Sequence, residues 1–353
     1  MISVPTITAN LIEPAFGILA DLGWRRALIL GGGVVFAAAL LLTALSQGFA
    51  LLMVAFLLLY PASGAFVSLS QAALMDTDPE RREQNMARWT FAGSMGVVAG
   101  PLALSLASVL NLDWRELMVI MAGLSVLALL WTWRTPIPDA RDQRSASADP
   151  QGAEPPLTFR AGVHSALKAL QRHDVLRWLV LLQASDLMLD ILYGFLALYF
   201  VDEVGVSAQS AALAVAVWTG FGLIGDFLLI PLVERVRGLV YLRISAALVL
   251  VLFPAFLLVP LLGIKLVIVG ALGLLNAGWY AILKAQLYAT MPGQSGTVLA
   301  VNNVSGLVGG LIPLGLGLVA EQIDLNAAMW LLIVSPVALL AGIPAQRSEA
   351  NDG

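Results

Sequence analysis

The sequence contains no cysteine and only two histidines, His164 and His173. Disulfides, thiol chemistry and cysteine-based metal sites are therefore excluded, and two histidines in a polar stretch supply almost no ligands for zinc. Charged residues make up 12% of the 353 residues, about half the share in soluble domains. No segment reads G-x-x-x-x-G-K-[ST], so nothing indicates a nucleotide-binding loop. We expect no enzyme activity, cofactor, metal or nucleic-acid partner.

Hydrophobic residues make up 59% of the chain, and its mean hydropathy is +0.87. A helix crosses the hydrocarbon core with about 20 apolar residues, and about eleven stretches are that long. Their approximate bounds are 1–20, 27–46, 49–74, 88–109, 115–133, 177–200, 208–232, 239–259, 265–287, 297–320 and 327–345. The sequence therefore predicts an all-α polytopic membrane protein.

Basic residues indicate the orientation. We call the short polar segments between the apolar stretches breaks. If the break at 21–26 faces the cytoplasm, nearly all Lys and Arg in the breaks lie on the cytoplasmic side, and only Arg115 and Lys265 lie on the outer side. Such a bias sets the orientation of helical membrane proteins. We expect a multi-pass protein of the plasma or inner membrane with a cytoplasmic C-terminus.

One long polar stretch divides the chain. We expect an N-terminal helical bundle at 1–134, a cytoplasmic linker at 135–176, a C-terminal bundle at 177–346 and a tail at 347–353. The linker begins with a composition typical of flexible segments. After Thr158, Phe159 and Leu167 alternate with Arg160 and Lys168 at helical spacing. This favours a short basic amphipathic helix on the inner membrane surface, although a solvated helix fits as well.

The two halves resemble each other at an offset of about 213 residues, which pairs Glu13 with Asp226 and Asp21 with Glu234. The counterpart of 177–200 then falls before Met1, so we expect the first half to lack its first helix. Three explanations are open: the start codon has been placed too far downstream, the sequence is a fragment, or the protein has only eleven helices.

The stretch from Leu176 to Val201 carries two carboxylates in its middle, Asp186 and Asp190. Their four-residue spacing puts them on one helix face, which Gln183 and Tyr193 extend. An ionised Asp at mid-membrane costs roughly 2.5–3.5 kcal/mol, so this face should avoid lipid. Two like charges disfavour double ionisation, so at least one should bind a proton more tightly than an isolated Asp. The face lines a transport pathway or forms a buried structural cluster.

Other polar residues in the spans are candidates too. Glu13 and Asp226 lie eight residues before the loop acids Asp21 and Glu234, which places them about 12 Å into the membrane along a helix. There they couple or gate transport, or they pair with a neighbouring helix and stabilise the fold. Lys284 either faces inward or snorkels to the surface. Amide and aromatic side chains at helical spacing suit a substrate cavity. These are Asn276, Trp279, Tyr280, Asn302, Asn303 and Tyr60.

The break after the first span reads GILADLGWRR and resembles the G-x-L-A-D-R-x-G-R-K loop of the major facilitator superfamily. The matching positions include Gly17, Asp21, Arg25 and Arg26. A weaker second copy begins at Glu234 and Arg235. Asp76-x-x-Pro79-x-x-Arg82 is also similar to this family, and Gly96-x-x-x-Gly100-Pro101 resembles its antiporter-associated helix-packing motif. Tyr60 stands where the family carries an Arg.

The resemblance implies an alternating-access carrier with two six-helix bundles and often proton coupling. The charged loop then forms a contact that breaks when the bundles rock, or it merely anchors the topology. We expect a monomer in the lipid bilayer that exports a small amphipathic or drug-like molecule against inward proton movement. Proton-coupled uptake of a sugar or organic acid, and a non-transporting sensor or scaffold, are the alternatives.

Overall fold

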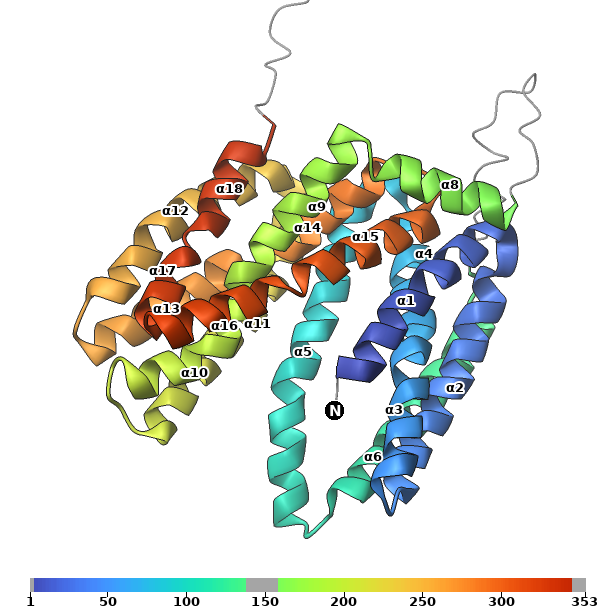
Figure 1. Ribbon diagram of the computed structural model, residues 1–353, viewed down its shortest axis with the longest axis horizontal. Helices are drawn as coiled ribbons and strands as arrows, with labels where there is room; N and C mark the ends of the chain where they lie inside the picture. Colours follow the sequence, from blue (N-terminus) through green and yellow to red (C-terminus); the bar gives the residue numbers. More distant parts are fainter. Residues whose placement is uncertain (1–2, 138–157, 345–353) are drawn as a thin grey trace, which may run out of the picture. The chain divides into compact units, whose positions relative to one another are not determined.

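The computed structural model describes residues 3–137 and 158–344, which form helices joined by short turns and contain no β-strand (Figure 1). Ten helical runs are long and apolar enough to cross a bilayer. The first, Val4–Leu45, has 42 residues, about twice what one crossing needs. It turns at Gly23, whose φ of 94° suits glycine, so it makes two crossings. The predicted all-helical membrane fold is confirmed, and its about eleven helices agree with this count.

The chain forms two compact units. Unit 1 consists of Met1–Trp89, Gly96–Leu176 and Ala285–Leu311, and unit 2 of Thr90–Met95, Arg177–Lys284 and Ile312–Gly353. The boundary passes through α5 (Arg82–Val109), α9 (His173–Asp186) and α14 (Trp279–Ala289). The division into bundles at 1–134 and 177–346 stays a prediction.

Unit 1 is built around α1 and α2. Its other helices are α3, α4, α6, α8, α15 and most of α5. The bounds are α1 Ser3–Leu19, α2 Arg25–Leu45, α3 Phe49–Ser63, α4 Leu69–Thr77, α6 Trp114–Arg134, α8 Phe159–Ala169 and α15 Ser295–Gly309. Helix α2 packs against α3 and α6, while α1 packs against α3 and α15. A wide π-turn, η2 (Gly64–Ser68), separates α3 from α4. Helix α6 begins at a capping box of Asp113 and Glu116.

Unit 2 contains the remaining helices. They are α10 Leu192–Asp202, α11 Ala208–Arg235, α12 Gly238–Leu258, α13 Leu262–Asn276, α16 Ile312–Gln322, α17 Leu325–Leu331, α18 Val334–Gly342 and, from Arg177 on, α9 His173–Asp186. Helix α11 packs against α10 and α13, and α12 packs against α13 and α18. A second π-turn, η4 (Leu187–Ile191), joins α9 to α10. Aromatic rings of α10 and α12, including Tyr199, Phe200 and Phe256, form one buried cluster.

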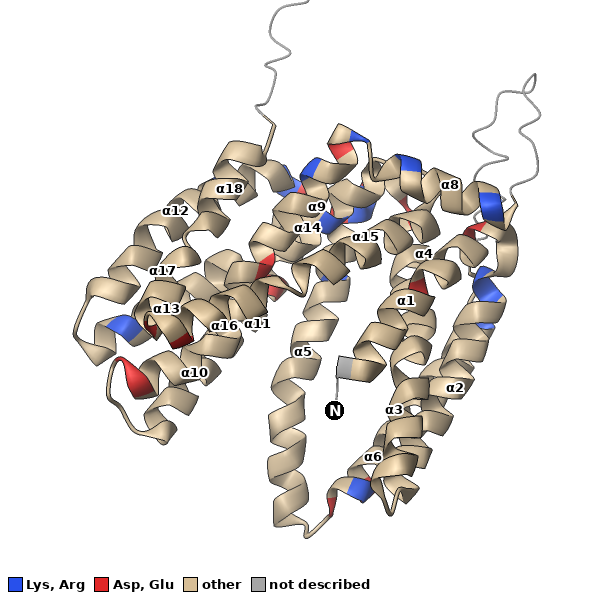
Figure 2. Ribbon diagram, in the orientation of Figure 1, with Lys and Arg blue, Asp and Glu red and all other residues tan. Residues whose placement is uncertain are grey.

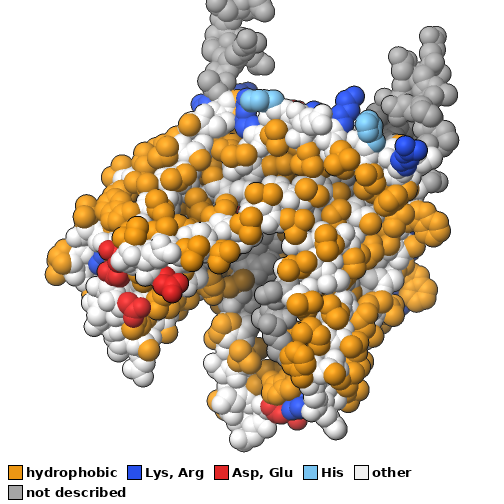
Figure 3. Space-filling view, in the orientation of Figure 1, with side chains coloured by type: hydrophobic (Ala, Val, Ile, Leu, Met, Phe, Trp, Pro, Cys, Tyr) orange, Lys and Arg blue, Asp and Glu red, His pale blue; other side chains and the backbone are white. Residues whose placement is uncertain are grey.

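The side-chain distribution agrees with a membrane location. In unit 1, α2, α3 and α6 are free of charged residues over most of their length (Figure 2). Hydrophobic side chains cover much of the visible surface (Figure 3), and many large ones, such as Leu127 and Trp131, are exposed. Exposed apolar surface on this scale is unfavourable in water and favourable in lipid. The chain is an integral, multi-pass membrane protein.

Candidate transport site

Asp21, in the turn between α1 and α2, caps α15. The backbone N–H groups of Gly296 and Thr297 donate to its two carboxylate oxygens at 2.9 and 2.7 Å, and the Thr297 hydroxyl donates at 2.7 Å. The first N–H groups of a helix lack intrahelical partners, and the N-cap residue Gln294 supplies no side-chain bond. Asp21 thus fills the role of a capping side chain, and its charge meets the positive end of the helix dipole.

Arg25 lies between two buried carboxylates. Its Nη1 is 2.8 Å from Asp76 Oδ2, and its Nη2 is 3.5 Å from Asp21 Oδ1. Nη2 also donates to Ser295 Oγ at 2.8 Å, and Ser295 Oγ donates to Asp76 at 2.5 Å. Arg25 is only 1% exposed, so this network is shielded from water. The α1–α15 joint, as we call Asp21, Arg25, Asp76 and Ser295–Thr297, therefore links the turn between α1 and α2 to α4 and α15 by ion pairs and hydrogen bonds.

Glycine allows the two backbones of this joint to touch. A Cβ added at Gly17 would lie 2.2 Å from the carbonyl oxygen of Gly296, and one at Gly296 would lie 2.0 Å from the carbonyl oxygen of Gly17. No real Cβ tolerates such distances. The residues of the predicted loop motif at Gly17, Asp21 and Arg25 therefore meet at one place.

The other predicted loop residues lie elsewhere. Arg26 is exposed and donates to the carbonyl oxygens of Trp133 at 2.7 Å and Thr135 at 3.4 Å, at the end of α6. Cations favour the C-terminal end of a helix. Glu234 and Arg235, from the second copy of the motif, are exposed at the end of α11 in unit 2.

Glu13 reaches an amide of α15. Its carboxylate accepts a 2.8 Å hydrogen bond from Asn303 Nδ2. Gly64 makes room for it, since a Cβ there would lie 2.3 Å from the Glu13 carboxyl carbon. Asn302 and Tyr60 are half-buried, and the Tyr60 ring packs edge-on against Phe56 at 6.4 Å.

In unit 2, Asp186 lies next to a buried lysine. Lys284, on α14, is 2% exposed and interacts electrostatically with Asp186. Its Nζ also lies 5.8 Å from the centre of the Tyr280 ring. Lys284 thus points into unit 2 and does not snorkel to the surface.

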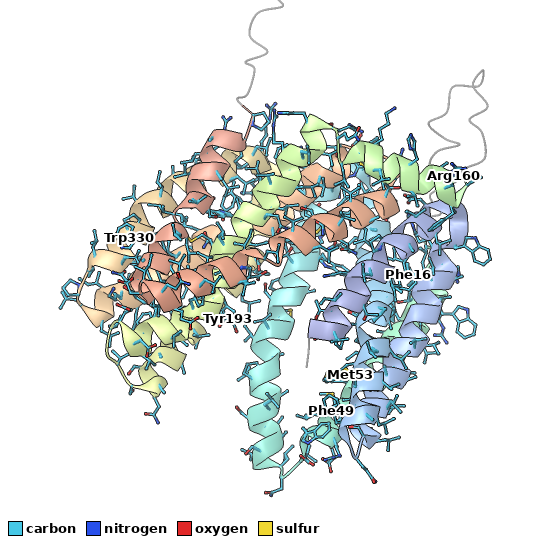
Figure 4. The ribbon with its side chains drawn as sticks, in the orientation of Figure 1. Phe16, Phe49, Met53, Arg160, Tyr193 and Trp330 are labelled. Carbon is cyan, nitrogen blue, oxygen red and sulfur yellow. The ribbon has the colours of Figure 1, made fainter. Side chains whose placement is uncertain are left out.

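Asp190 lies on the π-turn that follows Asp186. Two carboxylates at this spacing repel each other when both are ionised. Asp186 is half-buried and Asp190 is exposed. Gln183 is half-buried on α9, and Tyr193 is exposed on α10 (Figure 4). A π-turn inside a helix is rare and is frequently found at functional sites.

Asp226 is buried near a break between α13 and α14. Ser94 Oγ donates to its carboxylate at 2.5 Å, and the backbone N–H of Gly278, just before α14, donates as well. Gly278 has a φ of 82°, which turns the chain between the two helices. The Tyr241 hydroxyl lies 2.8 Å from the carbonyl oxygen of Ala277 in this break. Among the described residues Asp226 forms no ion pair.

The residues on either side of this break are inside unit 2. Asn276 is 1% exposed, and neither amide atom has a hydrogen-bond partner in the described part of the chain. Trp279 is fully buried, and its indole N–H donates to Ser245 Oγ at 2.9 Å. Tyr280 is half-buried. Their assignment to a substrate cavity remains a prediction.

The glycine motif on α5 faces open space. A Cβ at Gly96 or Gly100 would meet no atom within 4 Å, and Pro101 is exposed. Within the described chain no helix lies against these positions, so their packing role stays a prediction. The described residues also hold no group of three His, Asp or Glu that suits a metal ion.

Sequence reasoning missed several partners. Ser295 and Thr297 follow no motif, and Ser94 is an ordinary residue of an apolar helix. Only Asp76 has a recognisable sequence signal, because it belongs to the Asp-x-x-Pro-x-x-Arg segment. That signal does not by itself identify Asp76 as a partner of Arg25. The other three are recognised only through the carboxylates they contact.

Ten apolar helical runs, with carboxylates and two lysines buried within them, define a polytopic membrane protein whose buried charges are typical of transporters. Residues 1–314 match the Major Facilitator Superfamily, and the chain belongs to this family. No curated protein sequence matches the chain.

Solved structures share the fold. The E. coli fucose:proton symporter FucP has a TM-score of 0.78 and 15% sequence identity, over 97% of this chain and 89% of that chain. A structure of FucP in the outward conformation has a TM-score of 0.75 and 17% identity, over 97% and 88% of the two chains. The human organic anion transporter MFSD10 has a TM-score of 0.68 and 20% identity, over 97% and 82%. At these identities the likeness is one of fold alone.

Proposed function

We propose that this chain is a secondary active transporter that works by alternating access and exports a small amphipathic or drug-like molecule against inward proton movement, in the manner of drug:proton antiporters. The observation that carries the proton coupling is that Lys284 is buried inside unit 2 and interacts electrostatically with Asp186. The orientation with the Lys- and Arg-rich breaks and the C-terminus in the cytoplasm belongs to this proposal, and it rests on the positive-inside rule.

The pair gives a physical route for coupling. With Asp186 ionised and Lys284 charged, the pair is neutral overall and inexpensive to bury. A proton taken up by Asp186 leaves a net positive charge inside the membrane, which is costly. Protonation of Asp186 therefore favours a state in which Asp186 and Lys284 are exposed to water, or in which a bound group compensates the positive charge of Lys284. Asp190 lies beside Asp186 as a second proton or cation position, and Glu13 and Asp226 are further ones.

The α1–α15 joint supplies the gate in this proposal. The Asp21 bonds to Gly296 and Thr297 and the Arg25 pairs hold the start of α15 against α1. Buried bonds of this kind are strong when formed and costly when half broken, so they favour two discrete states. Glu234 and Arg235 are proposed as a second, weaker contact.

Substrate contacts are proposed for Gln183, Tyr193, Asn276, Trp279, Tyr280, Asn302, Asn303 and Tyr60. Proton-coupled uptake of a sugar or organic acid is the second candidate. The observation that favours it is the fold likeness to a fucose:proton symporter, together with an organic anion transporter.

Flux in proteoliposomes under an imposed pH gradient tests both candidates. The probes are ethidium for export and radiolabelled fucose and lactate for uptake. Movement of ethidium against the proton flow supports export, and co-movement of fucose or lactate with protons supports uptake. No gradient-driven flux of any probe, at normal insertion, counts against both.

Carboxylate variants test the coupling itself. Asp186→Asn and Asp190→Asn are compared with Asp202→Asn, an exposed carboxylate at the end of α10. We expect Asp186→Asn to abolish uphill flux while downhill exchange persists, and Asp202→Asn to change neither. If Asp186→Asn and Asp190→Asn both keep pH-driven uphill flux, these carboxylates do not carry the protons.

A further inference from the structure

Helix α8 rests directly on the α1–α15 joint. Gly162 faces α1 so closely that a Cβ there would lie 2.5 Å from Ile18 Cγ2. Ser165 Oγ donates to Gln294 Oε1 at 3.2 Å, at the N-cap of α15. Ala169 is buried at the other end of the helix. One face of α8 thus touches both helices that the joint connects.

This position shields the joint from water. A cavity of about 30 Å³ remains between α8 and the joint, and Ile18, Asp21, Leu22, Gly162, Ser165, Gln294 and Thr297 line it. Such a volume holds a water molecule or two, so bulk solvent is excluded. Hydrogen bonds to a carboxylate are stronger in a low-dielectric environment. A docked α8 therefore strengthens the bonds of Asp21 to α15.

The outer face of α8 is basic. Arg160, His164 and Lys168 follow one another at four-residue spacing and are all exposed. Arg160 projects from the start of the helix (Figure 4). None of these side chains has a protein partner among the described residues. Three adjacent donors of this kind suit a negatively charged partner.

An apolar stripe runs beside the basic one. Phe159 is 45% exposed and Leu167 is 56% exposed. The helix has 11 residues, too few to cross a bilayer, and it lies between the end of α6 and the start of α9, which are both ends of membrane spans. An exposed apolar stripe next to a basic stripe is typical of helices that lie in the membrane interface.

We propose that the outer face of α8 binds the headgroups of anionic phospholipids, and that this binding holds α8 on the α1–α15 joint and so keeps the joint closed. Arg160, His164 and Lys168 face the phosphates, while Phe159 and Leu167 enter the acyl boundary. A ligand that binds only the docked helix stabilises the docked state. The surface charge of the membrane then becomes an input to the gate.

The lipid contact is independent of the direction of transport and of the coupling ion. Its effect on flux rests on the proposed gate, but its effect on the joint does not. A measurement on the joint therefore separates failure of this proposal from failure of the proposed function.

The absence of cysteine makes such a measurement simple, because Leu22→Cys introduces the only thiol of the chain. Leu22 lines the cavity beneath α8, so labelling by a soluble maleimide reports undocking. The protein is compared in phosphatidylcholine vesicles with and without phosphatidylglycerol. We expect phosphatidylglycerol to slow labelling by about fivefold for each cation engaged, and salt to reverse the effect.

Charge variants of α8 identify the surface. In the Leu22→Cys background, Arg160→Gln with Lys168→Gln should abolish the lipid effect, whereas Arg160→Lys with Lys168→Arg should keep it. Arg237→Gln removes an exposed arginine of unit 2 and should change nothing. Equal labelling rates in the two kinds of vesicle, or a lipid effect that survives the double Gln substitution, would overturn the proposal.

Discussion

Asp21 and Asp226 are two buried carboxylates that cap helices from a distance, one in each unit. Asp21 accepts hydrogen bonds from the first turn of α15, and Asp226 accepts one from Gly278 just before α14. Their other neighbours differ. Arg25 accompanies Asp21 and also contacts Asp76, whereas Asp226 receives a neutral hydroxyl from Ser94.

This difference separates two uses of a buried carboxylate. A carboxylate paired with a buried cation remains charged as long as its site stays closed to water, because its protonation there would leave the cation uncompensated. A carboxylate with neutral donors can gain a proton without breaking an ion pair. The first arrangement suits a contact that holds two helices together, and the second suits a group that changes its charge.

The largest effect is expected for Arg25→Gln. The substitution removes the cation between Asp21 and Asp76, and loss of one member of a buried charge network costs roughly 3–5 kcal/mol. The midpoint of thermal unfolding in detergent should fall well below that of the Arg237→Gln control, which alters an exposed arginine. Equal midpoints would mean that the network at Asp21 contributes nothing to stability.

A second large effect is expected for Gly17→Ala. The new methyl group meets the carbonyl oxygen of Gly296, and backbone atoms cannot rotate away, so α1 and α15 must separate at about 1–3 kcal/mol. Gly31→Ala is the matched control, since a Cβ at Gly31 meets nothing within 4 Å. Thermal unfolding of the two variants gives the comparison. A Gly17→Ala protein as stable as Gly31→Ala would contradict the close contact.

Asp21→Asn should have an intermediate effect. The amide keeps one acceptor oxygen, but it loses the charge that meets the helix dipole and turns an NH₂ group toward a backbone donor, which costs about 1–2 kcal/mol. Hydrogen–deuterium exchange at 295–297 should accelerate, while exchange in α11 should not. Unchanged exchange at these amides would show that Asp21 does not cap α15 in solution.

The smallest effect on stability is expected for Asp226→Asn. Its partners Ser94 and Gly278 are neutral donors, and an amide oxygen accepts from both at a cost below about 1 kcal/mol. Thermal unfolding should therefore change less than in Asp21→Asn. A loss as large as that of Arg25→Gln would remove the distinction between the two carboxylates.

The fold could be predicted because its signals are local. Apolar stretches long enough to cross a bilayer predict the positions of the helices. The turn at Gly23 lies within the predicted break at 21–26. The family likeness was carried by a motif of ten consecutive positions, Gly17 to Arg26, and the match over 1–314 agrees with it.

The partners within the site could not be predicted, because they lie far apart in sequence. Gly296, whose N–H Asp21 caps, lies 275 residues later in the sequence, and no local pattern identifies it as the partner. From the sequence, Lys284 could either face the protein interior or snorkel to the surface. Only the packing of α14 shows that its side chain is buried. Trp279 shows the same limit, since composition does not distinguish a core indole from one in a cavity. The π-turn η4 also changes the helical phase on which the face of Asp186 and Asp190 was assigned.

The contact of Gly17 with Gly296 has a consequence for how the joint moves. Where two main chains touch with no side chain between them, separation requires no rotamer change and no repacking of interdigitated groups. The two helices can therefore separate and re-form their contact quickly. The strength of the contact is set by the hydrogen bonds and ion pairs around it. Both positions therefore have almost no mutational tolerance, although neither carries a functional group.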